Sequence, residues 1–182
     1  MRLFWKLVSR FFVVPVFRAG LGPFFGNPVS GYVMVVRTIG RKTGRVRYTP
    51  VVYAIADGSV YCVAGYGRGT DWYRNAIAAG SVGLLLPGRT VAGRVEEVHD
   101  AAERLAAIRY IFRNAGLMGF SEGFNPFRSS DATVSAKSAE MPVLRIAVLG
   151  VASGEADPGG RAWIWLPAAI AAAGVVVAVR RR

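Results

Sequence analysis

Residues 38–75 read TIGRKTGRVRYTPVVYAIADGSVYCVAGYGRGTDWYRN, and they predict more of the fold than any other part of this 182-residue chain. An apolar, β-branched segment, residues 46–56, predicts a strand. The Asp57-Gly58 pair that follows is a strong hairpin signal, because glycine tolerates a positive φ. A second strand is therefore predicted over residues 60–65, antiparallel to the first.

Two turns flank this hairpin, and both are suited to contact an anion. The first, residues 40–47 with the sequence GRKTGRVR, is called the basic turn here. Its glycines permit a tight connection with exposed backbone N–H groups, and arginine favours bidentate contacts with phosphate or carboxylate. The second, residues 64–69 with the sequence AGYGRG, is called the glycine-rich turn, and it opens a short helix capped by Thr70 or Asp71 and ended by Gly80. Neither turn has the spacing of a Walker loop or a dinucleotide fingerprint, and a solvated basic hairpin is the alternative for the first.

The composition limits the class of partner. A net charge of +12 indicates an anionic partner, which is a nucleic acid, a membrane surface or a polyanionic small molecule. Nucleic-acid binders usually interleave basic and aromatic residues along one face, whereas the arginines here lie in a turn and at the termini, so we expect no nucleic acid. Cys62 is alone and is expected to be a small buried residue. With His99 as the only histidine, we expect no metal site and discount a Ser-His-Asp arrangement.

The rest of the central region alternates between strands and helices. Further strands are predicted over residues 32–38, 82–86, 90–98 and 143–150. Asp100 and Glu103 resemble a capping box that opens a helix ending near Asn114. Residues 115–141 are rich in Gly, Ser and Phe and are expected to form a loop or lid. The fold class is therefore α+β, mainly β, with a six-stranded antiparallel barrel over residues 31–150 and helices inserted between strands.

The N-terminal segment, residues 1–30, begins with an amphipathic pattern. Arg2, Lys6 and Arg10 are spaced by four residues on an otherwise apolar helix that is expected to end at Pro15. A helix lying in a membrane interface is one interpretation. A helix packed on the domain with solvated charges is the other.

The C-terminal segment suggests an anchor. After a polar linker, residues 151–161, an apolar run covers residues 162–179, about 27 Å as a helix, and three arginines end the chain at 180–182. Membrane anchoring and a buried core helix are the two interpretations, and the terminal arginines favour the anchor. We expect a membrane-associated protein with its catalytic domain facing the cytoplasm.

In order and spacing, the basic turn, the hairpin and the glycine-rich turn resemble the deazaflavin-dependent nitroreductase family. Its members are split β-barrel enzymes that use coenzyme F420, an 8-hydroxy-5-deazaflavin. The resemblance covers residues 32–150 and is strongest over residues 38–75. It implies that the phosphate and oligoglutamate tail and its groove are contacted by Arg41, Lys42, Thr43, Arg47, Tyr48, Thr49, Pro50, Val51 and Val52. It also implies that Ala64, Gly65, Tyr66 and Gly67 approach the ring, and that Asp71, Trp72, Tyr73, Arg74 and Asn75 close the site.

The implied reaction is hydride transfer from the reduced deazaflavin to a small-molecule acceptor, which is a quinone, a nitro compound or an activated alkene. A lipid quinone would suit a membrane-associated enzyme. The chain departs from the family pattern at Tyr66, where a small hydroxyl residue is common, and we expect its phenol to act at the ring. Phe120, Phe124 and Phe127 stand where characterised relatives carry tyrosines, and phenylalanine cannot donate a proton.

Two alternatives belong to other functional classes. An FMN-binding or haem-binding protein on the same barrel is one, although FMN offers a single phosphate to a turn with several cations. A non-enzymatic basic module that binds anionic lipid or nucleic acid is the other.

Overall fold

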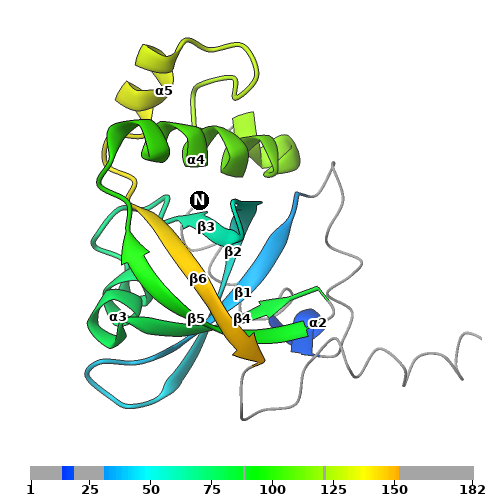
Figure 1. Ribbon diagram of the computed structural model, residues 1–182, viewed down its shortest axis with the longest axis vertical. Helices are drawn as coiled ribbons and strands as arrows, with labels where there is room; N and C mark the ends of the chain where they lie inside the picture. Colours follow the sequence, from blue (N-terminus) through cyan, green and yellow to red (C-terminus); the bar gives the residue numbers. More distant parts are fainter. Residues whose placement is uncertain (1–13, 19–30, 88, 121, 152–182) are drawn as a thin grey trace, which may run out of the picture.

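The predicted strands pair into a closed antiparallel barrel in the order β1-β2-β3-β6-β5-β4, with β4 returning to β1 (Figure 1). The computed structural model describes residues 14–18, 31–87, 89–120 and 122–151. The strands are β1 Val33–Ile39, β2 Val46–Ala56, β3 Ser59–Val63, β4 Ser81–Leu86, β5 Arg89–Glu97 and β6 Val143–Val151. The six-stranded antiparallel barrel predicted from the sequence is confirmed.

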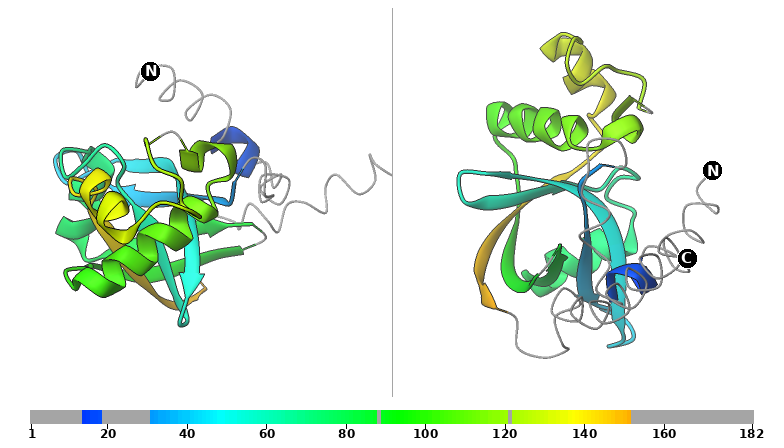
Figure 2. Two further views of the ribbon diagram at one scale, coloured as in Figure 1. Left: turned by 90° about the horizontal axis from the view of Figure 1, so that it is seen from above. Right: turned by 90° about the vertical axis from the view of Figure 1, so that its right-hand side faces the viewer.

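Helices lie on two sides of the barrel. Their bounds are α2 Val14–Arg18, α3 Asp71–Ala79, α4 Ala101–Arg113, the 3₁₀ helix η3 Gly116–Phe120 and α5 Asp131–Lys137. Figures 1 and 2 agree that α4 and α5 form a layer over one end of the barrel, while α3 lies toward the other end. We call these the helical end and the α3 end.

The β2–β3 hairpin forms as the sequence predicts. Asp57 and Gly58 both have positive φ, at 48° and 71°, which matches the right-handed twist of the flanking strands. Ser59 starts β3, where it pairs with Ala56. The helix predicted after the glycine-rich turn is also present, and Gly80 ends it in the left-handed conformation at φ 65°.

Three apolar clusters stabilise the fold. The first fills the barrel interior, with Met34, Leu84 and Ile146 fully buried. The second fills the space between the barrel and the α4–α5 layer, where Ile108 is fully buried. The third is smaller and packs Phe17 of α2 against β1 and β4.

Helix α4 is capped as predicted, although only half of the capping box forms. The Asp100 carboxylate accepts a hydrogen bond from the Glu103 backbone N–H at 2.7 Å. The Glu103 carboxylate accepts instead from the Tyr61 hydroxyl at 2.9 Å and the Arg145 guanidinium at 3.0 Å. This residue thereby joins α4 to β3 and β6. Thr70 precedes α3 without a side-chain cap, because its hydroxyl donates to the Gly67 carbonyl at 3.0 Å.

One expectation was wrong and another is not tested. The helix that Pro15 was expected to end lies outside the described residues, and within them Pro15 is the second residue of the short helix α2. Residues 115–141 were expected to be a loop or lid, but they contain η3 and α5. The physical reason is that Phe124, Val134 and Met141 are buried in the cluster beneath α4, so this segment contributes to the core.

The predicted amphipathic helix before residue 14 and the predicted anchor at residues 162–182 lie outside the described residues, and both stay predictions. Within the ranges that are described, we find no helix with the length and apolar character needed to cross a bilayer.

Candidate functional site

Strand β2 leaves one edge without a strand partner along its first half. Residues 46–52 pair with β1 on one side, and only residues 53–56 pair with β3 on the other. Within the described ranges, the β3-side edge of residues 46–52 therefore has backbone groups that no strand satisfies. The chain leaves β3 at this point to form the glycine-rich turn and α3, so β2 and β3 pair over only part of the length of β2.

Arg41 joins the basic turn to α3. Its backbone N–H donates to the Asn75 side-chain oxygen at 3.1 Å, and its guanidinium donates to the same oxygen at 3.0 Å and to Asp71 at 3.0 Å. Asn75 is 4% exposed, so this double acceptor is fixed in the protein interior. The hydrogen bond and the charge of Arg41 lower the pKa of Asp71. The two segments that the sequence analysis selected separately are thus held together by one arginine.

The basic turn itself is tight and exposed. Gly40 N–H donates to the Arg45 carbonyl at 2.8 Å, and Gly44 has a positive φ of 65°. Lys42 and Arg47 are both exposed, and neither forms a salt bridge with another described residue. Because Arg41 is engaged with α3, the cations at Lys42, Arg45 and Arg47 are the ones available to an anion.

The glycine-rich turn presents open space. A Cβ atom added at Gly65 or Gly69 would meet no atom within 4 Å. Gly67 differs, since its φ is 78° and an added Cβ would lie 3.2 Å from the Glu140 carbonyl oxygen. Tyr66 is 52% exposed between these glycines. A flat ring could therefore approach the backbone at Gly65 and Gly69. At position 67 a glycine is needed, because the backbone has a positive φ and lies close to the Glu140 carbonyl.

Two elements support this turn from behind. The Ala64 N–H donates to the Pro142 carbonyl at 3.0 Å, so the segment that precedes β6 lies against the turn. Glu97 at the end of β5 accepts hydrogen bonds from the Arg68 guanidinium and the Tyr73 hydroxyl. Burial and then the bond to Glu97 raise the pKa of Tyr73, and Glu97 raises the pKa of Arg68. Glu97 thus connects the glycine-rich turn, α3 and the barrel.

The remaining predicted residues differ in exposure. Exposed are Lys42, Thr43, Arg47, Gly65, Tyr66, Asp71 and Arg74; half-buried are Tyr48, Thr49, Pro50, Val51, Val52, Gly67 and Trp72; buried are Ala64, Tyr73 and Asn75. Val51 and Trp72 both pack against the barrel core. Tyr73 is a core residue whose hydroxyl is bonded to Glu97, so its structural role is clearer than a direct contact with a ligand.

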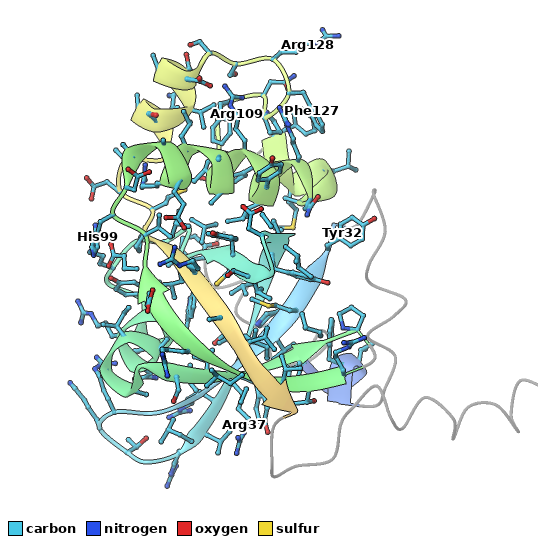
Figure 3. All side chains as sticks on the ribbon, viewed as in Figure 1. Tyr32, Arg37, His99, Arg109, Phe127 and Arg128 are labelled. Carbon is cyan, nitrogen blue, oxygen red and sulfur yellow. The ribbon has the colours of Figure 1, made fainter. Side chains whose placement is uncertain are left out.

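The ring contacts of the three phenylalanines among the described residues are made away from this site. Phe124 packs edge-on against Phe112 of α4 at 5.0 Å, and Phe120 stacks on Phe127 at 6.3 Å. Figure 3 places Phe127 at the outer side of the helical end. The part of residues 115–141 that reaches the glycine-rich turn is its last few residues, through Glu140.

Sequence reasoning missed Glu97 and the 138–142 segment. Glu97 is the last residue of a predicted strand, and nothing in its neighbourhood distinguishes it from an ordinary strand end. Its role depends on β5 and α3 lying side by side, which is a property of the closed barrel.

Other candidate groups do not contribute to this site. Burial raises the pKa of the Cys62 thiol to about 12, which agrees with the expected structural role. Within the described ranges, no group of His, Cys, Asp and Glu side chains could hold a metal ion. A shallow pocket of about 220 Å³ lies elsewhere, between β1, β4, β5 and the end of α3, and Arg37 lines it. None of the predicted site residues borders that pocket.

Comparisons with known proteins identify the family of this chain. Residues 13–115 match the model of the family described as F420H2-dependent quinone reductase. No curated protein matches the chain. A solved structure of a 5-nitroimidazole antibiotic resistance protein from Bacteroides thetaiotaomicron has a TM-score of 0.50 and 15% identity, covering 66% of this chain and 74% of that one. This likeness supports the fold.

Two further solved structures are similar at lower TM-scores. A conserved hypothetical protein from Mycobacterium tuberculosis has a TM-score of 0.48 and 14% identity, with coverage of 66% of this chain and 74% of that one. An F420H2-dependent reductase has a TM-score of 0.45 and 20% identity, with coverage of 63% and 92%.

Proposed function

Because this chain belongs to the F420H2-dependent quinone reductase family, it is an F420-dependent oxidoreductase, and we propose that it reduces a quinone at a site between the basic turn and the glycine-rich turn. The observation that carries the location is the connection of Arg41 to Asp71 and Asn75, which holds the basic turn against α3, the helix that follows the glycine-rich turn. The family favours coenzyme F420 over the FMN and haem alternatives, and an enzyme over a non-enzymatic binding module.

The residues present fit this cofactor. The exposed cations Lys42 and Arg47 match a polyanionic tail, and they lie beside the part of β2 that does not pair with β3 among the described strands. The open space over Gly65 and Gly69 matches a planar ring. In the proposed arrangement Lys42 and Arg47 hold the tail, and the glycine-rich turn supports the ring.

When bound, reduced F420 supplies a hydride, and the quinone becomes a quinol by taking up that hydride and one proton. We assign Tyr66 to the acceptor side, where its phenol donates a hydrogen bond or the proton to the quinone oxygen. Arg41 and Asn75 keep the tail-binding turn in register with the ring-binding turn. Glu97 fixes the backbone beneath the ring through Arg68 and Tyr73.

Anaerobic single-turnover oxidation of bound F420H2 by a naphthoquinone tests the acceptor. We expect stoichiometric oxidation of the cofactor with formation of quinol. A nitro compound and an activated alkene, supplied at equal concentration, separate quinone reduction from the other acceptor classes. Tight cofactor binding with no oxidation by the quinone would reject the acceptor while leaving the cofactor site intact.

Tyr66→Phe sharpens the test of the acceptor side. We expect kcat to fall by about 100-fold or more, with little change in F420H2 affinity, because the loss is of a proton donor. An unchanged kcat would remove Tyr66 from the mechanism.

We also propose that the enzyme works at the membrane surface on the cytoplasmic side. The terminal segments support this proposal through their sequence, as does the net charge of +12. Co-sedimentation of the full chain with lipid vesicles tests it, and recovery in the supernatant with anionic vesicles would contradict it.

A further inference from the structure

An exposed apolar surface lies at the helical end, away from the candidate site. It is formed by Leu117, Met118, Phe120 and Phe127, which are 74%, 41%, 47% and 59% exposed. We call these four residues the η3 patch, since three of them belong to η3. Single exposed apolar residues are ordinary on a protein surface, but four large ones gathered within one turn and its neighbouring loop are not.

The η3 patch is held in place by the underlying helix. Phe120 stacks on Phe127 at 6.3 Å, and the Arg113 guanidinium lies 5.6 Å from the centre of the Phe127 ring. The same guanidinium donates from Nε to the Pro126 carbonyl at 3.2 Å. The Asn125 side-chain oxygen accepts from the Phe127 N–H at 2.9 Å and from the Arg128 N–H at 3.2 Å. These bonds fix the backbone of residues 125–128, which carries the Phe127 ring.

Cationic side chains border the η3 patch. Arg113 and Arg128 are both exposed, and Arg128 projects from the outer side of the helical end beside Phe127 (Figure 3). One acidic residue, Glu122, lies in the same loop. Large apolar side chains at the centre with arginines at the margin match an anionic lipid surface, where the apolar groups enter the acyl boundary and the arginines stay at the headgroups.

A second copy of the chain fits this surface less well. A two-fold symmetric contact through the η3 patch would bring Arg113 and Arg128 of both copies together. Like charges at such an interface repel, and the two copies would have to bury them without enough acidic partners. Charge complementarity thus favours a bilayer.

We propose that the η3 patch, with Arg113 and Arg128, docks the protein on an anionic lipid bilayer. The proposal rests on the membrane location suggested above and specifies which face meets the lipid. In this orientation α3 and the basic turn point away from the bilayer, where they remain open to a water-soluble polyanionic cofactor. The helical end and the α3 end are at opposite sides of the barrel in Figures 1 and 2.

An environment-sensitive fluorophore at position 117 tests the contact directly. Leu117→Cys in the full chain is labelled with a nitrobenzoxadiazole probe, and the buried Cys62 does not compete for the reagent. The matched control is Ile77→Cys, an exposed position on α3 at 41%. Vesicles of phosphatidylglycerol and phosphatidylcholine are added, with and without spin-labelled lipids that quench only probes in contact with the acyl region.

We expect emission at position 117 to shift to shorter wavelength and to be quenched by the spin-labelled lipid, while position 77 stays unchanged. In Arg128→Gln the apparent vesicle affinity measured at position 117 should fall roughly fivefold, because each cation near an anionic surface contributes about that factor. Arg94→Gln, an exposed arginine of β5, should leave it unchanged.

Three outcomes would overturn the proposal. Vesicle-bound protein without quenching at position 117 would mean that another segment makes the contact. Equal quenching at both positions would mean that no face is selected. A concentration-dependent shift without lipid would identify self-association. Turnover with a water-soluble naphthoquinone is measured on the same samples, so that loss of quinone reduction is distinguished from failure of docking.

Discussion

The α3 end and the helical end of the barrel are stabilised by different kinds of interaction. At the α3 end, the segments of the candidate site are joined by side-chain hydrogen bonds through Arg41, Asn75 and Glu97. At the helical end, the α4–α5 layer is joined to the barrel mainly by a buried apolar cluster that includes Ile108, with Glu103 adding hydrogen bonds to β3 and β6. The candidate site thus depends on a few directional contacts, while stability depends on packing. This difference predicts that stability and cofactor binding can be changed separately.

The largest effect is expected from a change at the helical end. Ile108→Ala removes a fully buried side chain from the cluster beneath α4 and should lower the free energy of unfolding by about 4 kcal/mol. F420H2 affinity of the folded protein should be unchanged. Urea denaturation and equilibrium binding measure the two quantities. Ile77→Ala, at a 41% exposed position on α3, is the control and should cost less than about 0.5 kcal/mol.

Charge reversal at the α3 end should have the opposite effect, lowering cofactor affinity while leaving stability nearly unchanged. Lys42→Glu with Arg47→Glu should weaken F420H2 binding by about 100-fold, because two charge-assisted contacts are lost and repulsion replaces them. Stability should hardly change, since both side chains are exposed. Calorimetric titration at low salt measures the affinity. Arg128→Glu is the matched reversal at the helical end, and an equal loss of affinity there would contradict the assignment of the basic turn.

Asn75→Ala tests the connection between the two turns. It removes the shared acceptor of the Arg41 backbone N–H and guanidinium and should cost about 2 kcal/mol of stability, because a partly buried donor is left unpaired. Cofactor affinity should fall as well, since the basic turn loses its fixed position. At the helical end, Asn114→Ala removes a single 3.4 Å bond to the Tyr53 carbonyl and should cost less. Unchanged affinity in Asn75→Ala would mean that the basic turn is positioned by other contacts.

Local signals were sufficient for most of the fold. The Asp57-Gly58 turn and the Gly80 helix end were identified from the sequence because each depends on the conformational freedom of glycine at one position. The α5 helix was missed because residues 115–141 lack a strong apolar period. That segment folds because Phe124 and Val134 are buried against α4, which is a tertiary effect.

The candidate site shows the same division. The basic turn and the glycine-rich turn could be selected because their composition is unusual for a surface loop. The role of Arg41 could not, because its acceptors Asp71 and Asn75 are 30 and 34 residues away along the chain. Glu97 could not be selected either, since its partners are set by the closure of the barrel. Residues that bind a ligand directly leave a sequence pattern more often than residues that position them.

The smallest effect is expected at Tyr73, where the two kinds of interaction meet. Its ring is part of the barrel core and its hydroxyl donates to Glu97, so burial and this bond raise its pKa above the usual 10.0. The folded protein therefore holds the proton more tightly than the unfolded chain does. This contribution is fully present below pH 10.0 and is lost as the pH rises through the higher folded-state value.

Tyr73→Phe should cost about 1 kcal/mol at neutral pH and should reduce the loss of stability on going to alkaline pH. Tyr61 has a similarly raised pKa at the helical end, so some alkaline loss should remain in the variant. Urea denaturation from pH 8 to pH 11 compares the slopes. Identical slopes in Tyr73→Phe and the unmodified protein would show that the hydrogen bond to Glu97 is not stabilising.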